Sequence, residues 1–268
     1  MMRKDVKHGN TAGSFSAESV DQGAVHCALC GAAKSCLPML FHTGDAEILD
    51  TVLTGKRRVE RNAVLCREND RFDMLYVVRS GQFKVLSRDP GGTLHVVKFY
   101  MPGDIIGMEA IAAGVHVARV MALEDSEVCE ISYRNVRQAM ASAPQLGEQF
   151  LKIMSGALAN NYERSCLLSM ASLDERFAGF LLDLSNKYER RGYSSRSFRL
   201  SMTRSDIGSY LGTTVETVSR LIARFNTQHG VSISGRLVEL HDREQLRAVL
   251  DGSVASLLRG RGQPTCAG

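Results

Sequence analysis

The chain has 268 residues, of which 44% are hydrophobic and 23% are charged, the composition of an ordinary soluble globular protein. This length accommodates two domains with separate cores. No apolar run approaches the roughly 18–20 residues that span a bilayer, and the N-terminus lacks the apolar segment of a secretory signal. We therefore expect a cytoplasmic protein that has no membrane partner.

The net charge of +4 is unevenly distributed. Residues 187–261 contain 13 Lys/Arg and 7 Asp/Glu, so the remainder of the chain is net negative. This excess of positive charge favours a nucleic-acid-binding face in the C-terminal third. A solvated charged surface explains the charge alone equally well.

Residues 1–24 are polar and rich in Gly and Ser, which predicts a disordered arm. Three cysteines follow in the pattern C-x2-C-x5-C: Cys27, Cys30 and Cys36. Their short Gly/Ala-rich loop brings three sulfur atoms around one point, and thiolates select zinc or iron–sulfur centres. A closed all-cysteine site takes four thiolates, so a fourth ligand must come from elsewhere or the site stays open.

Short apolar runs alternate with Gly and Pro turns from about residue 47 to about residue 133. The runs at 75–78, 83–86 and 94–99 predict strands. Their even spacing indicates a small β-barrel or β-roll.

The pattern changes to a long helix from Pro144 to about Met170, with Ser142 and Pro144 as its start signals. Residues at alternating spacings of three and four form a candidate coiled-coil seam: Leu151, Met154, Leu158, Asn161, Ser165 and Leu168. A helix packed on its own domain would show the same pattern.

Three capping boxes predict the starts of three further helices: Ser172 with Glu175, Thr203 with Asp206, and Thr213 with Glu216. The first helix should end near Gly192, the second near Tyr210, and the third near Phe225. Gly212 provides a tight turn between the second and third helices, the layout of a helix-turn-helix. Residues 232–240 predict a hairpin, which would form the wing of a winged helix.

One face of the third helix carries Glu216, Ser219 and Arg220 at i, i+3 and i+4. Arg binds guanine bidentately, Glu accepts from the cytosine amino group, and Ser donates or accepts. The opposite side is apolar and can pack inward: Val215, Val218, Leu221 and Ile222. The alternative is a solvated face with a Glu216–Arg220 ion pair.

Residues 202–212, residues 216–220 and the N-terminal cysteine loop resemble the FNR branch of the CRP/FNR transcription regulators. The resemblance extends from about residue 25 to about residue 240. It implies an α+β protein with a β-roll sensor domain, a dimerisation helix and a winged helix-turn-helix. The corresponding divisions are residues 1–24 (arm), 25–143 (cysteine loop and β-roll), 144–171 (dimerisation helix), 172–252 (DNA-binding domain) and 253–268 (loose tail).

The resemblance implies that Cys129 is the fourth ligand of a 4Fe–4S cluster, although the residues alone favour a core thiol at this position. Cys66 and Cys166 read as core-type thiols, and Cys266 lies in the tail. In the family the intact cluster favours the DNA-binding homodimer, and oxygen converts it to a 2Fe–2S form that dissociates the dimer. The expected function is therefore that of an oxygen-sensing transcription regulator of anaerobic gene expression rather than an enzyme.

The resemblance also implies inverted repeats of TTGAT-like half-sites in double-stranded DNA. The expected DNA-binding residues are Glu216, Ser219, Arg220, Thr203, Arg204, Thr213 and Thr214. RNA polymerase is the expected partner, with residues 88–93 as a candidate contact loop. The sister branch binds cyclic AMP through an Arg-Ser pair; His116 and Val117 occupy the matching positions here, so no cyclic nucleotide is expected.

Two other functions are compatible with parts of the sequence. A regulator that responds to nitric oxide or to thiol oxidation could use the same cysteines without a stable cluster. An iron–sulfur electron carrier or enzyme is the alternative from a different class. The sequence contains no cofactor-binding glycine fingerprint after a strand and no catalytic constellation that would support it.

Overall fold

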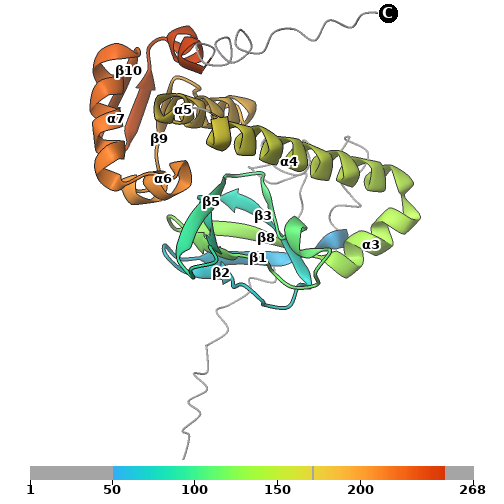
Figure 1. The fold of residues 1–268 in the computed structure, drawn as a ribbon. Helices are drawn as coiled ribbons and strands as arrows, with labels where there is room; N and C mark the ends of the chain where they lie inside the picture. Colours follow the sequence, from blue (N-terminus) through green and yellow to red (C-terminus); the bar gives the residue numbers. More distant parts are fainter. Residues whose placement is uncertain (1–50, 171, 251–268) are drawn as a thin grey trace, which may run out of the picture.

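The computed structural model describes residues 51–170 and 172–250. Eight strands of the N-terminal half form two antiparallel four-stranded sheets, in the orders β1-β8-β3-β6 and β2-β7-β4-β5. Their bounds are β1 Leu53–Val59, β2 Val64–Cys66, β3 Met74–Ser80, β4 Phe83–Arg88, β5 Leu94–Tyr100, β6 Ile105–Ile106, β7 Arg119–Ala122 and β8 Ser126–Ser132. The predicted β-roll and its three strands are confirmed (Figure 1).

Alternation along the strands gives the roll two apolar clusters, because successive side chains point to opposite faces of a sheet. Val78 and Val128 lie in the cluster between the two sheets. Val77, Cys129 and Ile131 lie in a second cluster on the other face of the first sheet, against α3 (Tyr133–Ser142) and α4 (Pro144–Met170). Helix α4 therefore rests on the face of the sheet that carries Cys129.

Helix α3 was not expected from the sequence. It follows β8 directly, and the Ser132 hydroxyl caps it by accepting from the Asn135 N–H. Only Ala143 separates α3 from α4. The predicted bounds of the long helix are confirmed, and Pro144 occupies the first helical position, where a missing N–H has no cost. The prediction that Ser142 signals this start is wrong, because Ser142 ends α3 and its hydroxyl donates to the Gln138 carbonyl at 3.2 Å.

The C-terminal half contains helices α5, α6 and α7, a three-stranded sheet of order β10-β11-β9, and a helical segment over residues 243–250. Their bounds are α5 Leu173–Arg190, β9 Ser197–Arg199, α6 Arg204–Leu211, α7 Val215–Gln228, β10 Val231–Ser234 and β11 Leu237–Leu240. The capping boxes of α5 and α6 and the hairpin at 232–240 are confirmed. The third capping box is wrong: Thr214, not Thr213, caps α7, by accepting from the Thr217 N–H.

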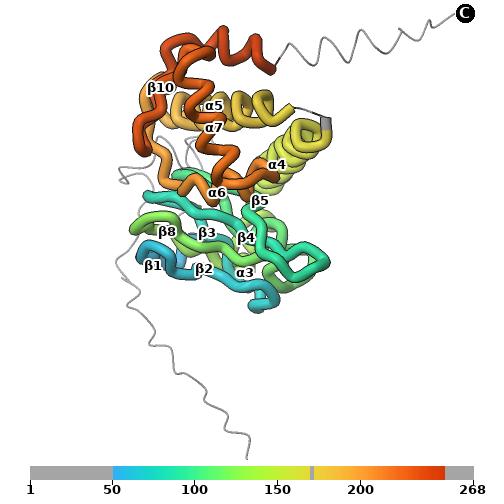
Figure 2. The backbone as a smooth tube through the Cα atoms, turned by 60° about the vertical axis from the view of Figure 1, so that its left-hand side comes forward, coloured from blue at the N-terminus to red at the C-terminus, as the bar shows by residue number. Residues whose placement is uncertain are grey.

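The roll and the C-terminal half share an apolar cluster. Val96 and Phe99 of β5 pack with Phe177 and Phe180 of α5 and with Ile207 of α6. Figure 2 shows α6 beside β5, with α4 leading from the roll to α5. Across the described residues no helix has the length and apolarity that crossing a membrane requires.

Polar bonds reinforce this contact between the halves. Lys84 Nζ of β4 lies 2.6 Å from Asp206 Oδ1 of α6, and the Val96 N–H donates to Ser209 Oγ at 2.8 Å. Arg191, after α5, binds Asp104 of the roll at 2.8 Å. The roll therefore holds the first helix of the helix-turn-helix through both apolar and charged contacts.

Candidate nucleic-acid interface and sensor site

Two glycines set the close approach of α6 and α7. Gly212 ends α6 with φ 71°, a left-handed conformation that glycine adopts without steric cost. At Gly208 an added Cβ would lie 2.9 Å from the carbonyl oxygen of Thr213, so only glycine lets the two helices meet there. This geometry places the N-terminus of α7 at the molecular surface.

Helix α7, the second helix of the helix-turn-helix, presents the predicted polar face. Glu216 and Arg220 are exposed and Ser219 is half-buried, whereas Val218, Leu221 and Ile222 are buried as predicted. The inward orientation predicted for Val215 is wrong, because its side chain is 40% exposed. Its position in the first turn of α7, next to the capping Thr214, leaves it outside the packed stripe.

Hydrogen bonds of the polar face keep its charged groups separate. Arg220 Nη2 donates to Thr217 Oγ1 at 3.1 Å, and no ion pair joins Arg220 to Glu216 within the described chain. The Glu216 carboxylate accepts from its own backbone N–H and from the Thr214 hydroxyl, which lowers its pKa. The Glu216 carboxylate is therefore charged at neutral pH, and both side chains are exposed.

The remaining predicted DNA-binding residues lie at the N-termini of α6 and α7, where backbone N–H groups attract phosphate. Thr203, Arg204 and Thr214 are exposed, and Thr213 is half-buried. Arg204 Nη1 donates to Ser219 Oγ at 3.2 Å, so it joins the polar face of α7. This hydrogen bond could not be predicted from the sequence, because it joins residues of two different helices.

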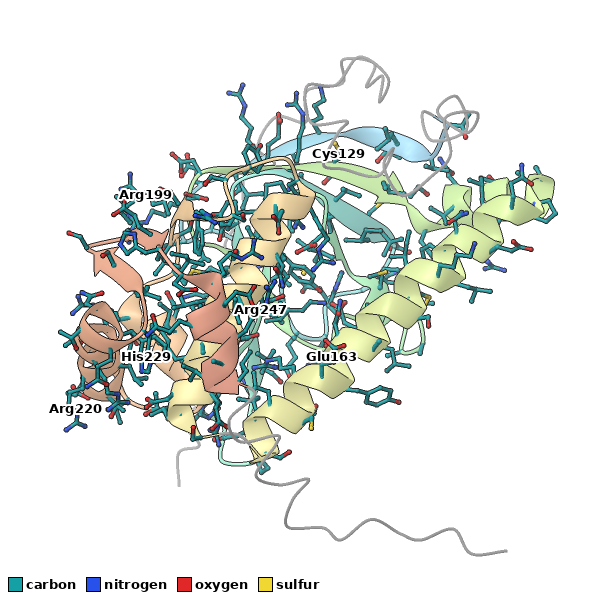
Figure 3. The ribbon with its side chains drawn as sticks, turned by 90° about the horizontal axis from the view of Figure 1, so that it is seen from above. Cys129, Glu163, Arg199, Arg220, His229 and Arg247 are labelled. Carbon is teal, nitrogen blue, oxygen red and sulfur yellow. The ribbon has the colours of Figure 1, made fainter. Side chains whose placement is uncertain are left out.

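Two further cations went unpredicted. Arg199 of β9 pairs with Leu237 in the sheet register and is exposed, and Arg236 lies in the β10–β11 turn. Figure 3 shows Arg199 and Arg220 on the same side of the molecule. Arg236 could have been predicted from the sequence, because it is a basic residue at the tip of the predicted hairpin.

Cys129 lies at the centre of β8, between Lys56 of β1 and Val77 of β3 in the sheet register (Figure 3). Its side chain is 6% exposed, within the apolar cluster that faces α3 and α4. Cys27, Cys30 and Cys36 lie outside the described residues. No group of three metal-ligating side chains occurs within the described part, which includes only one of the four predicted ligands.

The structure separates the other described cysteines. Cys66 is 4% exposed, and burial raises the pKa of its thiol to about 12, so the core reading is confirmed. The prediction that Cys166 is a core residue is wrong, because this residue lies on the exposed side of α4. Cys266 lies outside the described residues.

His116 and Val117 have different environments. His116 is 3% exposed and its ring meets Phe72 edge-on, at 5.8 Å between centroids. Val117 is 49% exposed and offers no side-chain donor. A buried imidazole and an exposed isopropyl group cannot supply the bidentate contacts of an Arg-Ser pair.

The predicted seam of α4 divides between two sides of the helix. Leu151 and Leu158 are 66% and 52% exposed, and Asn161 and Ser165 are also exposed. Met154 and Leu168 are half-buried, because they turn toward the remainder of the chain. Tyr162 is 67% exposed and was missed, although its i+4 spacing from Leu158 could have placed it on the same side.

The sequence resembles known proteins over most of its length. Residues 56–143 match the protein family described as "Cyclic nucleotide-binding domain". Residues 175–249 match the family described as "Crp-like helix-turn-helix domain". The anaerobic regulatory protein of Haemophilus influenzae is 35% identical over 233 residues, covering 86% of this chain and 91% of that protein. The fumarate and nitrate reduction regulatory protein of Escherichia coli is 34% identical over 223 residues, covering 83% and 89%.

Among solved structures, FixK2 from Bradyrhizobium japonicum superposes with a TM-score of 0.67 at 27% identity, covering 74% of this chain and 97% of that one. A β-roll, a long helix and a winged helix-turn-helix, in this order, define a DNA-binding transcription regulator and not an enzyme. The chain belongs to the Crp/FNR family of these regulators.

Proposed function

We propose that the protein is an oxygen-responsive regulator of anaerobic gene expression, in which a 4Fe–4S cluster on Cys27, Cys30, Cys36 and Cys129 favours the DNA-binding dimer. Loss of the cluster in oxygen then releases the DNA. The names of the Haemophilus influenzae and Escherichia coli relatives, which concern anaerobic regulation and fumarate and nitrate reduction, support the class of genes.

The observation that carries the proposal is the pairing of β1 with β8. Leu53, the first residue of β1, lies opposite Ile131, two residues from Cys129. Sixteen residues separate Cys36 from Leu53, and an extended chain spans up to about 3.3–3.6 Å per residue. The N-terminal cysteines are thus connected to the fold close to Cys129 and within easy reach of it.

The surroundings of Cys129 fit an iron–sulfur group. Ile131 and Val77 on its own sheet and Phe72 and Ile105 nearby belong to the same apolar cluster. An apolar shell limits solvent access, which governs the redox behaviour of a thiolate-bound centre. When bound, a 4Fe–4S cluster supplies an oxygen-labile redox centre; the residues of β8 hold one ligand rigidly, because both neighbouring strands pair with it.

The outward side of α4 supports dimerisation. Three large side chains form a stripe on this side and are all more than half exposed in the single chain: Leu151, Leu158 and Tyr162. An exposed apolar stripe of this kind indicates a surface that binds a partner. In a dimer, α4 of the second copy would cover this stripe, because the two helices of a parallel or antiparallel pair bury each other's apolar seam. Asn161 and Ser165 are the polar members of the predicted seam and would keep the association marginal.

The polar face of α7 supports readout in the major groove. Arg220 and Glu216 are charged and exposed, and Arg204 is bonded to Ser219 beside them. In a dimer, two such helices would read the halves of an inverted repeat of the TTGAT type. The buried His116 and the exposed Val117 support regulation without a cyclic nucleotide, and the exposed turn at residues 88–93 remains the proposed contact with RNA polymerase.

The test is the visible spectrum and the DNA affinity of protein purified without oxygen. We expect broad iron–sulfur absorption, bleaching in air, and a parallel loss of affinity for a TTGAT inverted repeat. A colourless, zinc-containing protein that binds the repeat equally in air would refute the proposal. Bleaching by nitric oxide but not by oxygen would favour the alternative regulator.

A further inference from the structure

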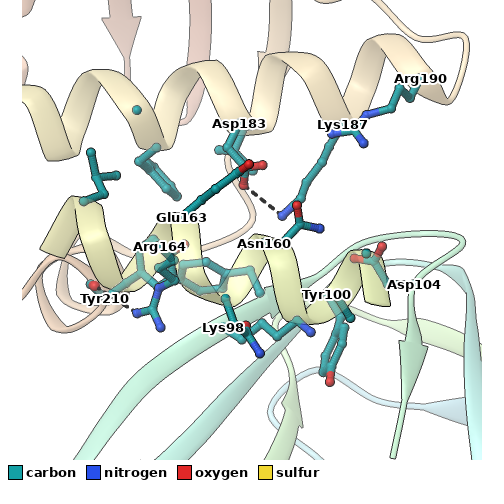
Figure 4. A pocket seen from close by; sticks show the side chains of 18 of the residues that line it. Lys98, Tyr100, Asp104, Asn160, Glu163, Arg164, Asp183, Lys187, Arg190 and Tyr210 are labelled. Carbon is teal, nitrogen blue, oxygen red and sulfur yellow. Dashed lines mark hydrogen bonds and ion pairs between the residues drawn. The ribbon is translucent and has the colours of Figure 1, made fainter. Parts of the chain in front are cut away.

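A cavity of about 640 Å³ lies between the roll, α4 and α5, at the junction of the two halves. Its volume is within the range of small-molecule sites, about 300–1,000 Å³. β5 contributes Lys98, α4 contributes Arg164, and α5 contributes Lys187 (Figure 4). His116 and Val117 do not line it, so it is separate from the position of the cyclic-nucleotide phosphate in the sister branch.

The lining carries an excess of positive charge. Seven Lys/Arg side chains and three Asp/Glu side chains face the cavity. Two of the carboxylates are already paired within the protein: Asp183 with Lys187 at 2.8 Å, and Asp104 with Arg191 at 2.8 Å. The third, Glu163, is exposed on α4. Neither of these two ion pairs involves Lys98 or Arg164.

Lys98 and Arg164 are the cations with the least compensation. Lys98 Nζ lies 4.6 Å from the centroid of the Tyr100 ring and has no acidic partner within the described chain. Burial of the ammonium lowers its pKa, and the charges of Asp104 and Glu109 only partly oppose this effect. The Arg164 guanidinium stacks on Tyr210 at 4.3 Å and gives one bond to the Tyr210 carbonyl, but its buried Nε has no partner in the described structure.

Part of the wall is aromatic. Phe99 and Phe180 lie 5.0 Å and 5.6 Å from the ring of Tyr210, measured between centroids, and all three residues line the cavity. Buried cations cost free energy unless an anion compensates them. A ligand that satisfies both the cations and the apolar wall carries several negative charges and a flat, largely apolar body.

We propose that this cavity binds a nucleoside polyphosphate, with the phosphates on Lys98 and Arg164 and the base against the wall formed by Phe99, Phe180 and Tyr210. Cys129 does not line the cavity, although Ile105 belongs both to the lining and to the apolar cluster around Cys129. Gly156 and Arg164 of α4 face away from the exposed stripe of Leu151, Leu158 and Tyr162, so the cavity leaves this stripe open for dimerisation. Asn161 and Leu168 of the predicted seam also line the cavity.

The experiment is calorimetric titration of the full-length protein, prepared without oxygen, with ATP, GTP, inorganic pyrophosphate and adenosine at up to millimolar concentration. We expect saturable binding of ATP or GTP, weaker binding of pyrophosphate and none of adenosine. Absence of saturable binding by either nucleotide would overturn the proposal. Pyrophosphate binding as tightly as the nucleotides would overturn the role of the base.

Variants locate the site. Lys98→Met keeps the aliphatic chain beside Tyr100, and Arg164→Gln keeps a donor; each should weaken nucleotide binding by about tenfold or more. Arg134→Gln removes a cation from the exposed surface of α3, outside the cavity, and should bind as the parent does. Melting temperatures without nucleotide check that each variant is folded, and removal of the poorly compensated Lys98 charge should not lower this value.

Two results would contradict the assignment. The first is unchanged nucleotide affinity in folded Lys98→Met and Arg164→Gln proteins. The second is loss of affinity in Arg220→Ala, which would place the nucleotide at the DNA-binding face of α7. The visible spectrum of the variants should equal that of the parent, so failure of this proposal would leave the assignment of the cluster unaffected.

Discussion

Two buried cysteines of the roll illustrate how single positions determine chemistry. Cys129 and Cys66 are 6% and 4% exposed, and both lie on strands. Cys129 belongs to the cluster facing α3 and α4, next to the strand that leads in from the N-terminal segment. Cys66 lies between the two sheets, where burial keeps its thiol protonated and unreactive.

We expect Cys129→Ser to lose the cluster and Cys66→Ser to keep it. A serine hydroxyl is a poor ligand for an iron–sulfur group, whereas at position 66 it only replaces one small side chain with another. Iron and sulfide content per chain, measured on anaerobic protein, distinguishes the two variants. Full iron content in Cys129→Ser would remove this residue from the ligand set.

The exposed guanidinium of Arg220 gives a second prediction. Arg220→Ala should weaken binding to the cognate half-site by about 1–3 kcal/mol and relax the preference at one base pair. Arg204→Gln should weaken all sequences alike and reduce the salt dependence by about one unit of slope, because it acts on phosphate. Titrations of cognate and scrambled duplexes at several salt concentrations provide the comparison. An equal loss for Arg220→Ala on both duplexes would mean that α7 does not read bases.

Elements were predictable where local signals and packing agree. The continuous apolar run of β3, the start of α4 at Pro144 and the capping boxes of α5 and α6 follow from short-range chemistry. Helix α3 was missed because no glycine or proline separates it from β8. Its only start signal is Ser132, which is also the last residue of that strand. The exposed side of α4 could not be fixed from spacing, since the burial of Met154 depends on contacts with distant residues.

The N-terminal cap of α7 gives a prediction at the scale of a single helix. Thr214→Ala should destabilise α7 by about 1 kcal/mol, because the Thr217 N–H loses its acceptor. Thr213→Ala is the matched control and should have a much smaller effect, since Thr214 is the capping residue. Urea unfolding midpoints of the two variants measure the difference. A larger effect at Thr213 would contradict the capping assignment.

Helix α4 gives the prediction for dimerisation. Asn161→Leu should strengthen the dimer of cluster-free protein, because it replaces an exposed amide in the seam with an apolar side chain. Asn161→Asp should weaken it by at least about 1 kcal/mol through repulsion between the two carboxylates. Sedimentation equilibrium in air measures both, with Asn160→Asp as a control one residue away. A fully dimeric Asn161→Asp protein would place the switch elsewhere.

The arrangement of the two halves was beyond prediction from the sequence. The contact between Lys84 and Asp206 joins residues 122 positions apart, and each is unremarkable in its local context. The same holds for the cavity, whose cations come from three separate elements. These contacts form because α4 leads from the roll to the C-terminal helices and places them against the roll. No local sequence pattern encodes such an arrangement.

The Lys84–Asp206 pair gives a prediction for the molecule as a whole. Burial opposes ionisation of Asp206, but bonds from Lys84 and Thr203 outweigh it and lower its pKa below the usual 3.8. The carboxylate therefore stabilises the folded protein above that pH, and this contribution disappears as the pH falls through the lowered value. Lys84→Met should lose about 1–3 kcal/mol at neutral pH and show a shallower decline in acid.

Arg71→Met is the control for this variant, because its partner Asp73 and Arg71 itself are 62% and 84% exposed, and exposed pairs contribute little. Thermal unfolding on either side of pH 3.8 gives the comparison. Identical stability of the Lys84→Met and Arg71→Met proteins at neutral pH would show that the contact between the halves is weak in solution.

The packing of β5 against α5 and α6 also determines how the molecule opens. Phe99 and Val96 share a cluster with Phe177, Phe180 and Ile207, so the β4–β5 hairpin loses its cover when the helices unfold. Cooperative opening units follow such contacts. The hairpin should therefore exchange its amide hydrogens together with α5 and α6, while β1, β3 and β8 stay protected. The boundary between the units that unfold would then pass through the sensor domain rather than beside it.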